Sequence, residues 1–166
     1  MTTRIGMPLP RVEDERFLTG TGRYTDDITL PRQLRGAVVR SPHAHARIKH
    51  LDPSAALAIL GVLAVYTITD LDAGGIGPLP CDVILTNRNG HPMTVPERPV
   101  LAREKVRYVG EPVAFVVAET EMAARDGAEA VAVEYDDRPA VTDARAALCS
   151  DAPRLYESVP GNLLFD

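Results

Sequence analysis

The stretch VAFVVAETEMAARDGAEAVAVEYDD (113–137) decides the fold. Its first six residues are apolar and rich in β-branched and aromatic side chains, which predicts a central strand. Thr120 is suited to cap a helix over 120–130, where alanine recurs. Residues 131–137 then alternate apolar and polar side chains, which predicts a half-buried strand. A strand–helix–strand order of this kind favours a crossover connection packed on a mixed sheet.

The sequence before this stretch predicts shorter elements and more loop. Fourteen prolines and twelve glycines in 166 residues indicate a loop-rich architecture. Residues 1–33 predict an extended arm, and residues 73–100, with glycine or proline every few positions, predict a long surface loop. Strands are expected at 34–40, 46–52, 61–68 (a buried strand) and about 105–108, and short helices at 53–60 and 69–72. The residues alone therefore indicate an α+β domain.

Composition excludes several classes of partner. A formal net charge of -5 argues against nucleic acid or an anionic membrane surface. The longest apolar run, 113–118, is far too short to span a membrane. The first eleven residues lack the apolar core of a signal peptide, so we expect a cytoplasmic protein. Cys81 and Cys149 are isolated, and without a C-x-x-C pair the chain predicts neither a zinc ribbon nor an iron–sulfur cluster of its own.

Three of the four histidines fall in RSPHAHARIKH (40–50). His43 and His45 have the H-x-H spacing that brings two imidazoles to one side of a strand, as metal sites require. Further ligands would have to come from tertiary contacts, with these candidates: His91, Asp52 and Glu111. The alternative is that these histidines bond backbone groups at a corner between two strands, and the residues favour this alternative.

Nucleophile and phosphate motifs give no firmer site. Ser41 with a histidine, or Cys81 with His91, supplies the residue types of a nucleophile and a base, but the motif G-x-S-x-G is absent. The glycine-rich pieces at 20–22 and 74–77 do not match a phosphate-binding loop. Residue chemistry alone therefore predicts no catalytic residue.

The chain nevertheless resembles a known family along almost its whole length. The similar segments are RVEDERFLTGTGRYTDDI (11–28), LRGAVVRSPHAHARI (34–48), GVLAVYTITDL (61–71), YVGEPVAFVVAETEMAARDGAEAVAVEYDDRPAV (108–141) and PGNLLFD (160–166). They resemble the N-terminal a/b hammerhead domain in the molybdopterin-binding large subunit of the molybdenum hydroxylases. These are xanthine dehydrogenase, aldehyde oxidase and carbon monoxide dehydrogenase, and the arm is most similar to the carbon monoxide dehydrogenase branch.

The resemblance implies an architecture and a setting. It implies an α+β, hammerhead-like mixed sheet with a few short helices, over 34–150. The arm at 1–33 would precede it, and a linker at 151–166 would lead toward a molybdopterin-binding domain. The complete enzymes oxidise substrates at molybdopterin and pass electrons through [2Fe-2S] clusters and usually FAD on partner subunits or domains.

The resemblance also implies that catalysis lies elsewhere. The family's cofactor loops and catalytic residues belong to regions beyond this sequence, so we expect no catalytic, cofactor-binding or metal residue in this chain. It would be a fragment, a split-subunit piece or a truncated gene product, and its substrate is not predicted. Glu111 is a hypothetical interface residue toward the cofactor domains. Two alternatives stay open: a small metal-dependent hydrolase using His43 and His45, and a stand-alone assembly module using the 73–100 loop.

Overall fold

The chain divides into two compact units after Gln33. The structure, a computed structural model, describes residues 6, 8 and 10–166. The first unit covers 1–33 and the second covers 34–166.

The first unit consists of short local elements. They are α1 (Asp14–Leu18) and the 3-10 helix η1 (Thr25–Asp27). The Asp27 carboxylate accepts the backbone amide of Tyr24 at 2.9 Å, and the Tyr24 ring stacks on Phe17 with 5.3 Å between centroids. None of the described residues of this unit is buried. Positions 1–5, 7 and 9 of the predicted arm lie outside the described residues.

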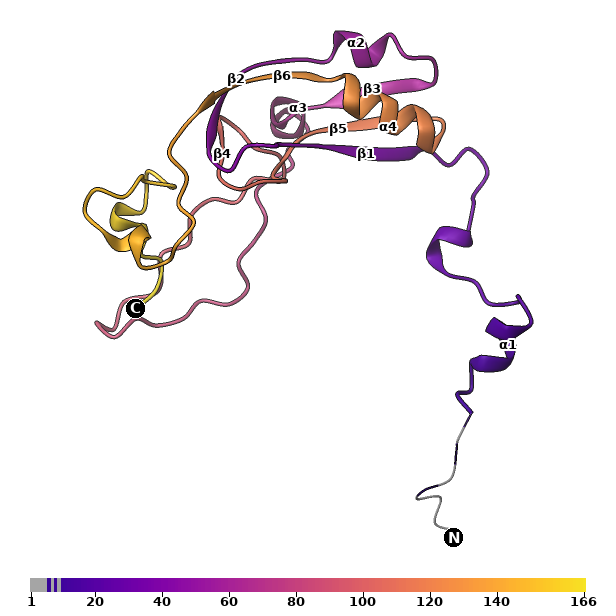
Figure 1. Cartoon of the computed structure of the whole chain (residues 1–166), viewed down its shortest axis with the longest axis horizontal. Coiled ribbons are helices and arrows are strands. Elements are labelled where there is room, and N and C mark those ends of the chain that lie inside the picture. Colours follow the sequence, from indigo (N-terminus) through magenta and orange to yellow (C-terminus); the bar gives the residue numbers. More distant parts are fainter. Residues whose placement is uncertain (1–5, 7, 9) are drawn as a thin grey trace. The chain divides into compact units, whose positions relative to one another are not determined.

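The second unit is built on two three-stranded antiparallel sheets (Figure 1). Sheet A has the strand order β1–β5–β3, and sheet B has the order β4–β2–β6. The strands are β1 Arg35–Arg40, β2 Ala46–Asp52, β3 Val62–Tyr66, β4 Lys105–Val106, β5 Pro112–Ala118 and β6 Ala132–Asp137. All six predicted strand positions and the α+β class are confirmed.

The helices of this unit are short, as predicted, apart from α4. They are α2 Ser54–Leu57, α3 Ile68–Ala73, α4 Glu121–Ala130, and the 3-10 helices η2 Ala146–Leu148 and η3 Pro160–Asn162. Thr120 caps α4 as predicted, because its hydroxyl accepts the amide of Ala123 at 3.1 Å. Helix α2 ends three residues before the predicted limit of 60.

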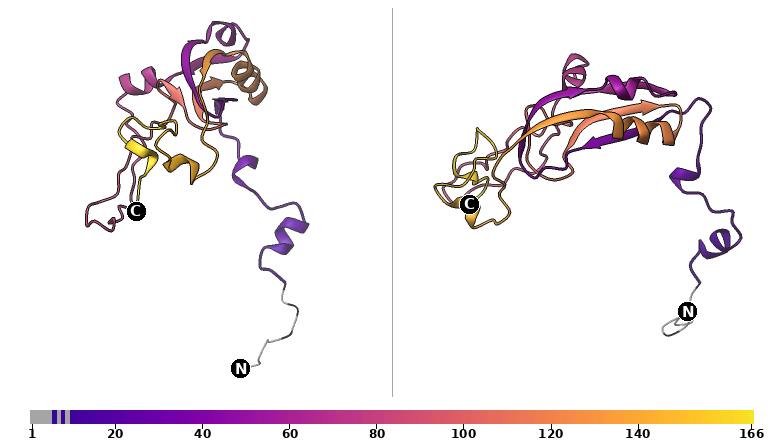
Figure 2. Two further views of the ribbon diagram at one scale, coloured as in Figure 1. Left: turned by 60° about the vertical axis from the view of Figure 1, so that its left-hand side comes forward. Right: turned by 45° about the horizontal axis from the view of Figure 1, so that its top comes forward.

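The predicted crossover on a mixed sheet is wrong in its strand pairing. β5 pairs with β1 and β3, whereas β6 pairs with β2 in the other sheet, and all of these pairings are antiparallel. Both edges of β5 are taken by strands that precede it in the chain, so β6 has no free edge of β5 to join. The stretch 113–137 therefore connects two sheets through α4 (Figure 2).

The core is made of small side chains. Its main cluster comprises Val39, Ala46, Ala56, Ala102, Val106, Val113, Ala114, Val116 and Val131. Helix α4 lies close to sheet A at Gly127, where an added Cβ would be 2.9 Å from Val116 Cγ1 and 3.0 Å from Val62 Cγ2. Those distances are shorter than ordinary carbon contacts, so this approach requires glycine.

The prediction that 61–68 is a buried strand is wrong in its burial. β3 forms an edge of sheet A, and none of its five residues is fully buried. Leu63 and Tyr66 are 51% and 43% exposed. An apolar run favours a strand covered on both faces, and in this chain one face is open.

The predicted loop at 73–100 begins at the last residue of α3 and is otherwise irregular, apart from a single antiparallel bridge between Thr86 and Pro92. The end of the chain lies against this loop (Figure 1). The Asp166 amide donates to the Asn87 side chain at 2.8 Å, and the Arg88 amide donates to the Asp166 carbonyl at 2.9 Å. No helix in the described part of the chain is both long and apolar enough to cross a membrane.

The segment predicted as a linker, 151–166, is fixed to the rest of the second unit. The Asn162 side chain accepts the Leu155 amide and donates to the carbonyls of Ala147 and Pro153, each at 3.0 Å. Val159 is only 2% exposed.

Candidate functional site at the histidine corner

The corner between β1 and β2 is held by backbone and hydroxyl hydrogen bonds. The Ser41 hydroxyl accepts the His43 amide at 3.0 Å. The Ser41 carbonyl accepts the Gly110 amide at 2.7 Å, and the Ser41 amide donates to the Glu111 carbonyl at 3.0 Å. These bonds join the corner to the turn before β5, where Gly110 has a φ of 88°.

His45 hydrogen-bonds a distant backbone carbonyl, as the favoured alternative predicted. Its Nδ1 lies 2.8 Å from the carbonyl oxygen of Pro139, and the residue is 5% exposed. Because a carbonyl only accepts, Nδ1 carries the proton and Nε2 of the neutral ring is left with a lone pair. Nε2 is buried and has no hydrogen-bond partner among the described residues.

His43 makes a different contact at the same corner. Its Nδ1 is 2.5 Å from an Asp137 carboxylate oxygen, and its ring lies against Tyr135 with 4.5 Å between centroids. Burial raises the pKa of the Tyr135 phenol, although its hydrogen bond with the Ser41 side chain opposes that change.

The two imidazoles do not form a metal site with the predicted partners. His43 faces Asp137, His45 faces Pro139, and Asp52 accepts the Ser54 amide at 2.9 Å. Among residues 6, 8 and 10–166, no three His, Cys, Asp or Glu side chains gather as metal ligands would. The metal-dependent hydrolase alternative therefore has no ligand set in this part of the chain.

The nucleophile pairings are not formed either. The Ser41 hydroxyl is engaged with the backbone of His43, and the Cys81 thiol donates to the Val83 carbonyl at 3.3 Å. The amide of His91 donates to the Asn89 side chain at 3.0 Å within the 73–100 loop. Among the described residues neither nucleophile forms a hydrogen bond with an imidazole.

We predict that His45 stabilises the corner through its Nδ1 proton. His45→Leu is expected to lower the free energy of unfolding by about 0.5–1.5 kcal/mol, because the hydrogen bond between the buried imidazole and the Pro139 carbonyl is lost. His45→Asn, whose amide nitrogen occupies nearly the place of Nδ1, should retain more of that stability. Urea denaturation followed by circular dichroism measures both changes. A His45→Leu variant as stable as the wild type would contradict this role.

Glu111, the predicted interface residue, is turned inward. It is 8% exposed, and its carboxylate accepts the backbone amide of Arg107. The other carboxylate oxygen is 3.7 Å from the Arg107 guanidinium, whose Cζ also lies 4.4 Å from the centre of the Tyr156 ring. Arg107 donates to the Leu155 carbonyl at 3.0 Å, so the pair joins the turn before β5 to the C-terminal segment.

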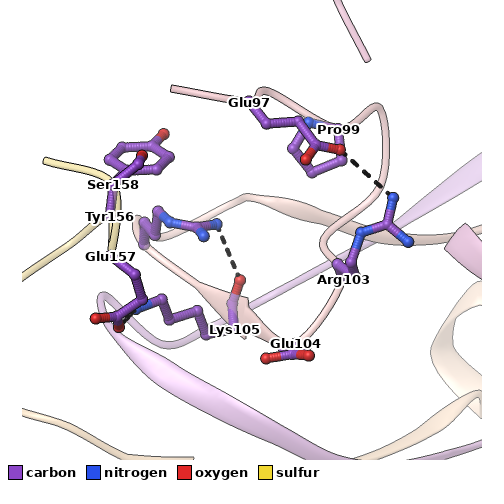
Figure 3. A pocket seen from close by; sticks show the side chains of 9 residues that line it. Glu97, Pro99, Arg103, Glu104, Lys105, Tyr156, Glu157 and Ser158 are labelled. Atoms are coloured by element: carbon purple, nitrogen blue, oxygen red, sulfur yellow. Dashed lines mark hydrogen bonds and ion pairs between the residues drawn. The ribbon is translucent and has the colours of Figure 1, made fainter. Parts of the chain in front are cut away.

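Arg107 of this pair also lines a charged pocket. Figure 3 shows the pocket and labels most of its other lining residues. Its lining residues are Glu97, Pro99, Arg103, Glu104, Lys105, Arg107, Tyr156, Glu157 and Ser158. Lys105 is 2.8 Å from Glu157, and Arg103 contacts Glu97 at 3.5 Å and Asp72 through both carboxylate oxygens. The hydrogen bond from Arg103 holds the pKa of Asp72 below its usual range. Arg103, Lys105 and Arg107 therefore already have partners within the chain.

Sequence reasoning did not find Arg107, Asp137 or Pro139. Leu155 is 48 positions from Arg107, and Pro139 is 94 positions from His45. No local pattern marks such pairs, because both partners are fixed by the packing of separate elements.

A family model matches most of the second unit. The model describes the a/b hammerhead domain of aldehyde oxidase and xanthine dehydrogenase, and it matches residues 19–139.

Individual relatives agree with that match. The carbon monoxide dehydrogenase large chain of Afipia carboxidovorans is 41% identical over 155 residues, which cover 93% of this chain and 18% of the relative. The xanthine dehydrogenase molybdenum-binding subunit of Escherichia coli O157:H7 is 34% identical over 161 residues, 93% of this chain and 20% of the relative. A crystal structure of Cu,Mo-CO dehydrogenase superposes with a TM-score of 0.76 at 40% identity, covering 96% of this chain and 19% of that one. The chain thus spans about a fifth of the length of these relatives.

Proposed function

Because the chain belongs to the aldehyde oxidase and xanthine dehydrogenase family, as the hammerhead domain of its large subunit, we propose that it is a structural domain of a molybdenum-containing oxidoreductase. It supports assembly of the large subunit and supplies no catalytic group itself. The match over residues 19–139, with relatives about five times as long, carries this proposal. The reaction is an oxidation of the carbon monoxide dehydrogenase, xanthine dehydrogenase or aldehyde oxidase type.

We place the molybdopterin cofactor in the remainder of the large subunit, and FAD and [2Fe-2S] clusters on partner subunits or domains. The charged pocket does not fit a pterin cofactor, because its Arg103, Lys105 and Arg107 are held by acidic or carbonyl groups of the same chain. We derive no step of the reaction through the cofactor from these residues. A cytoplasmic location is part of the proposal and is consistent with two free cysteines in the described chain.

We propose that Glu111 contributes to the interface indirectly, by fixing the conformation of a backbone turn. Its carboxylate holds the turn at Arg107, and that turn presents Tyr108 and Val109, which are 55% and 64% exposed. We propose that these two side chains, rather than the inward carboxylate, reach toward the cofactor domains.

A chimera tests the proposed function. This chain replaces the 155 aligned residues of the Afipia carboxidovorans carbon monoxide dehydrogenase large chain, co-expressed with that enzyme's other subunits. We expect a folded large subunit that retains molybdenum, measured by elemental analysis of the purified complex. The isolated 166-residue chain should bind no stoichiometric metal. A chimera that never loads molybdenum while the parent enzyme does, or stoichiometric molybdenum or zinc on the isolated chain, would overturn the proposal.

A further inference from the structure

The two faces of sheet A have different surroundings. Strand register places Ala37, Val116 and Val65 in one row across the three strands. Val116 is fully buried, and α4 covers this inner face at Gly127. The inner face is therefore part of the core.

The outer face is equally apolar, and nothing in the described chain fully buries it. One row across the strands is Val38, Phe115 and Tyr66, and the next is Gly36, Val117 and Ala64. Phe115 is 37% exposed and Tyr66 43% exposed, and the Phe115 ring lies over Gly36, where an added Cβ would be 2.3 Å from it. None of the six residues carries a charge.

An antiparallel sheet with one face in water normally alternates apolar residues inward with polar residues outward. Strands that are apolar on both sides are those covered on both faces. β5 reads PVAFVVA and β3 reads VLAVY, and neither strand has a charged residue. These two strands have the composition of a sheet buried on both sides, while only one side is buried in this chain.

We infer that the outer face of sheet A, formed by Gly36, Val38, Ala64, Tyr66, Phe115 and Val117, is a docking surface for an apolar, uncharged face of the large-subunit remainder. This inference rests on the proposed function and names the surface through which the domain would be assembled.

The size of the face and the length of the relatives favour that occupant over a second copy of the chain. Tyr66 and Phe115, each about 40% exposed, together offer an accessible surface area on the order of 150 Å². A stable interface buries about 800 Å² of accessible surface on each partner. The face is thus too small to hold two free copies together, but suits one part of a larger contact within a subunit. About four fifths of each relative lies outside the matched region, which provides chain for such a contact.

Site-specific thiol labelling tests the inference. Tyr66→Cys and Phe115→Cys are made separately, with both native cysteines changed to serine, in the isolated chain and in the chimera with the Afipia large chain. Labelling of each site by a small maleimide is followed by mass spectrometry of the peptide that contains it. We expect ready labelling in the isolated chain and labelling slowed by about tenfold or more in the molybdenum-loaded chimera. Met122→Cys, on α4 and 74% exposed, is the control and should label equally in both.

The outcomes separate the two proposals. Equal labelling of Tyr66→Cys and Phe115→Cys in the isolated chain and in a molybdenum-loaded chimera would overturn the docking surface and leave the proposed function standing. Equal slowing at Met122→Cys would mean general protection and would also overturn it. Labelling of the isolated chain that slows as its concentration rises would assign the face to a second copy. A chimera that fails to load molybdenum would overturn both proposals.

Discussion

Replacing Gly127 by valine is expected to lower the free energy of unfolding of the chain by about 3 kcal/mol. A Cβ at this position would already be 2.9 Å from Val116 and 3.0 Å from Val62, and valine adds two methyl groups beyond it. Both neighbours are β-branched side chains on strands and have little rotamer freedom with which to move away. Helix α4 would have to shift off sheet A. Urea denaturation monitored by far-UV circular dichroism measures the loss.

Glu129→Val is the matched control for this substitution. Glu129 lies two residues further along the same helix on its exposed side, so the same valine is added without a packing conflict. Only the difference in helix propensity remains, and the expected change is within about 0.5 kcal/mol. Similar losses for the two variants would show that the close approach of α4 to sheet A does not stabilise the fold.

The second large effect is expected at Glu111. Glu111→Ala should lower the free energy of unfolding by about 2–3 kcal/mol, because it leaves the guanidinium of Arg107 without its carboxylate in a mostly buried place. The side chains of this pair are 17% and 10% exposed. Chemical denaturation at neutral pH measures the change.

The chain contains its own comparison for this substitution. Glu121 and Arg125 form the same type of pair at the same spacing of four, 2.5 Å apart, but their side chains are 67% and 72% exposed. Glu121→Ala is expected to change stability by about 0.5 kcal/mol or less. If Glu111→Ala costs no more than Glu121→Ala, the buried pair has no special role in holding the turn before β5.

Local patterns predicted the elements of this chain and did not predict their partners. β5 and α4 were found because a run of apolar β-branched residues and a Thr120 cap are signals contained within a few positions. The pairing of β5 was missed because β1 and β3, which occupy its edges, lie far earlier in the sequence. Strand pairing over such distances depends on tertiary packing, which periodicity does not encode.

The same distinction explains the histidine corner. The spacing of His43 and His45 correctly directed attention to a corner between strands, but it could not show which groups face each ring. Those groups, Asp137 at the end of β6 and the Pro139 carbonyl just after it, lie about ninety positions later. The charged pocket was missed for the same reason, since Lys105 and Glu157 are 52 positions apart.

The strand order also has a consequence for how the chain acquires its structure. Every pairing in the two sheets joins a strand from 35–66 to one from 105–137. During synthesis at roughly 5–20 residues per second, β1, β2 and β3 would therefore emerge several seconds before any of their native neighbours. Their unpaired edges, with free backbone N–H and C=O groups, are open to other nascent chains for that interval. Contacts of such long range also form slowly. Yield in the cell should therefore depend on what shields the first hundred residues until β5 and β6 have been made.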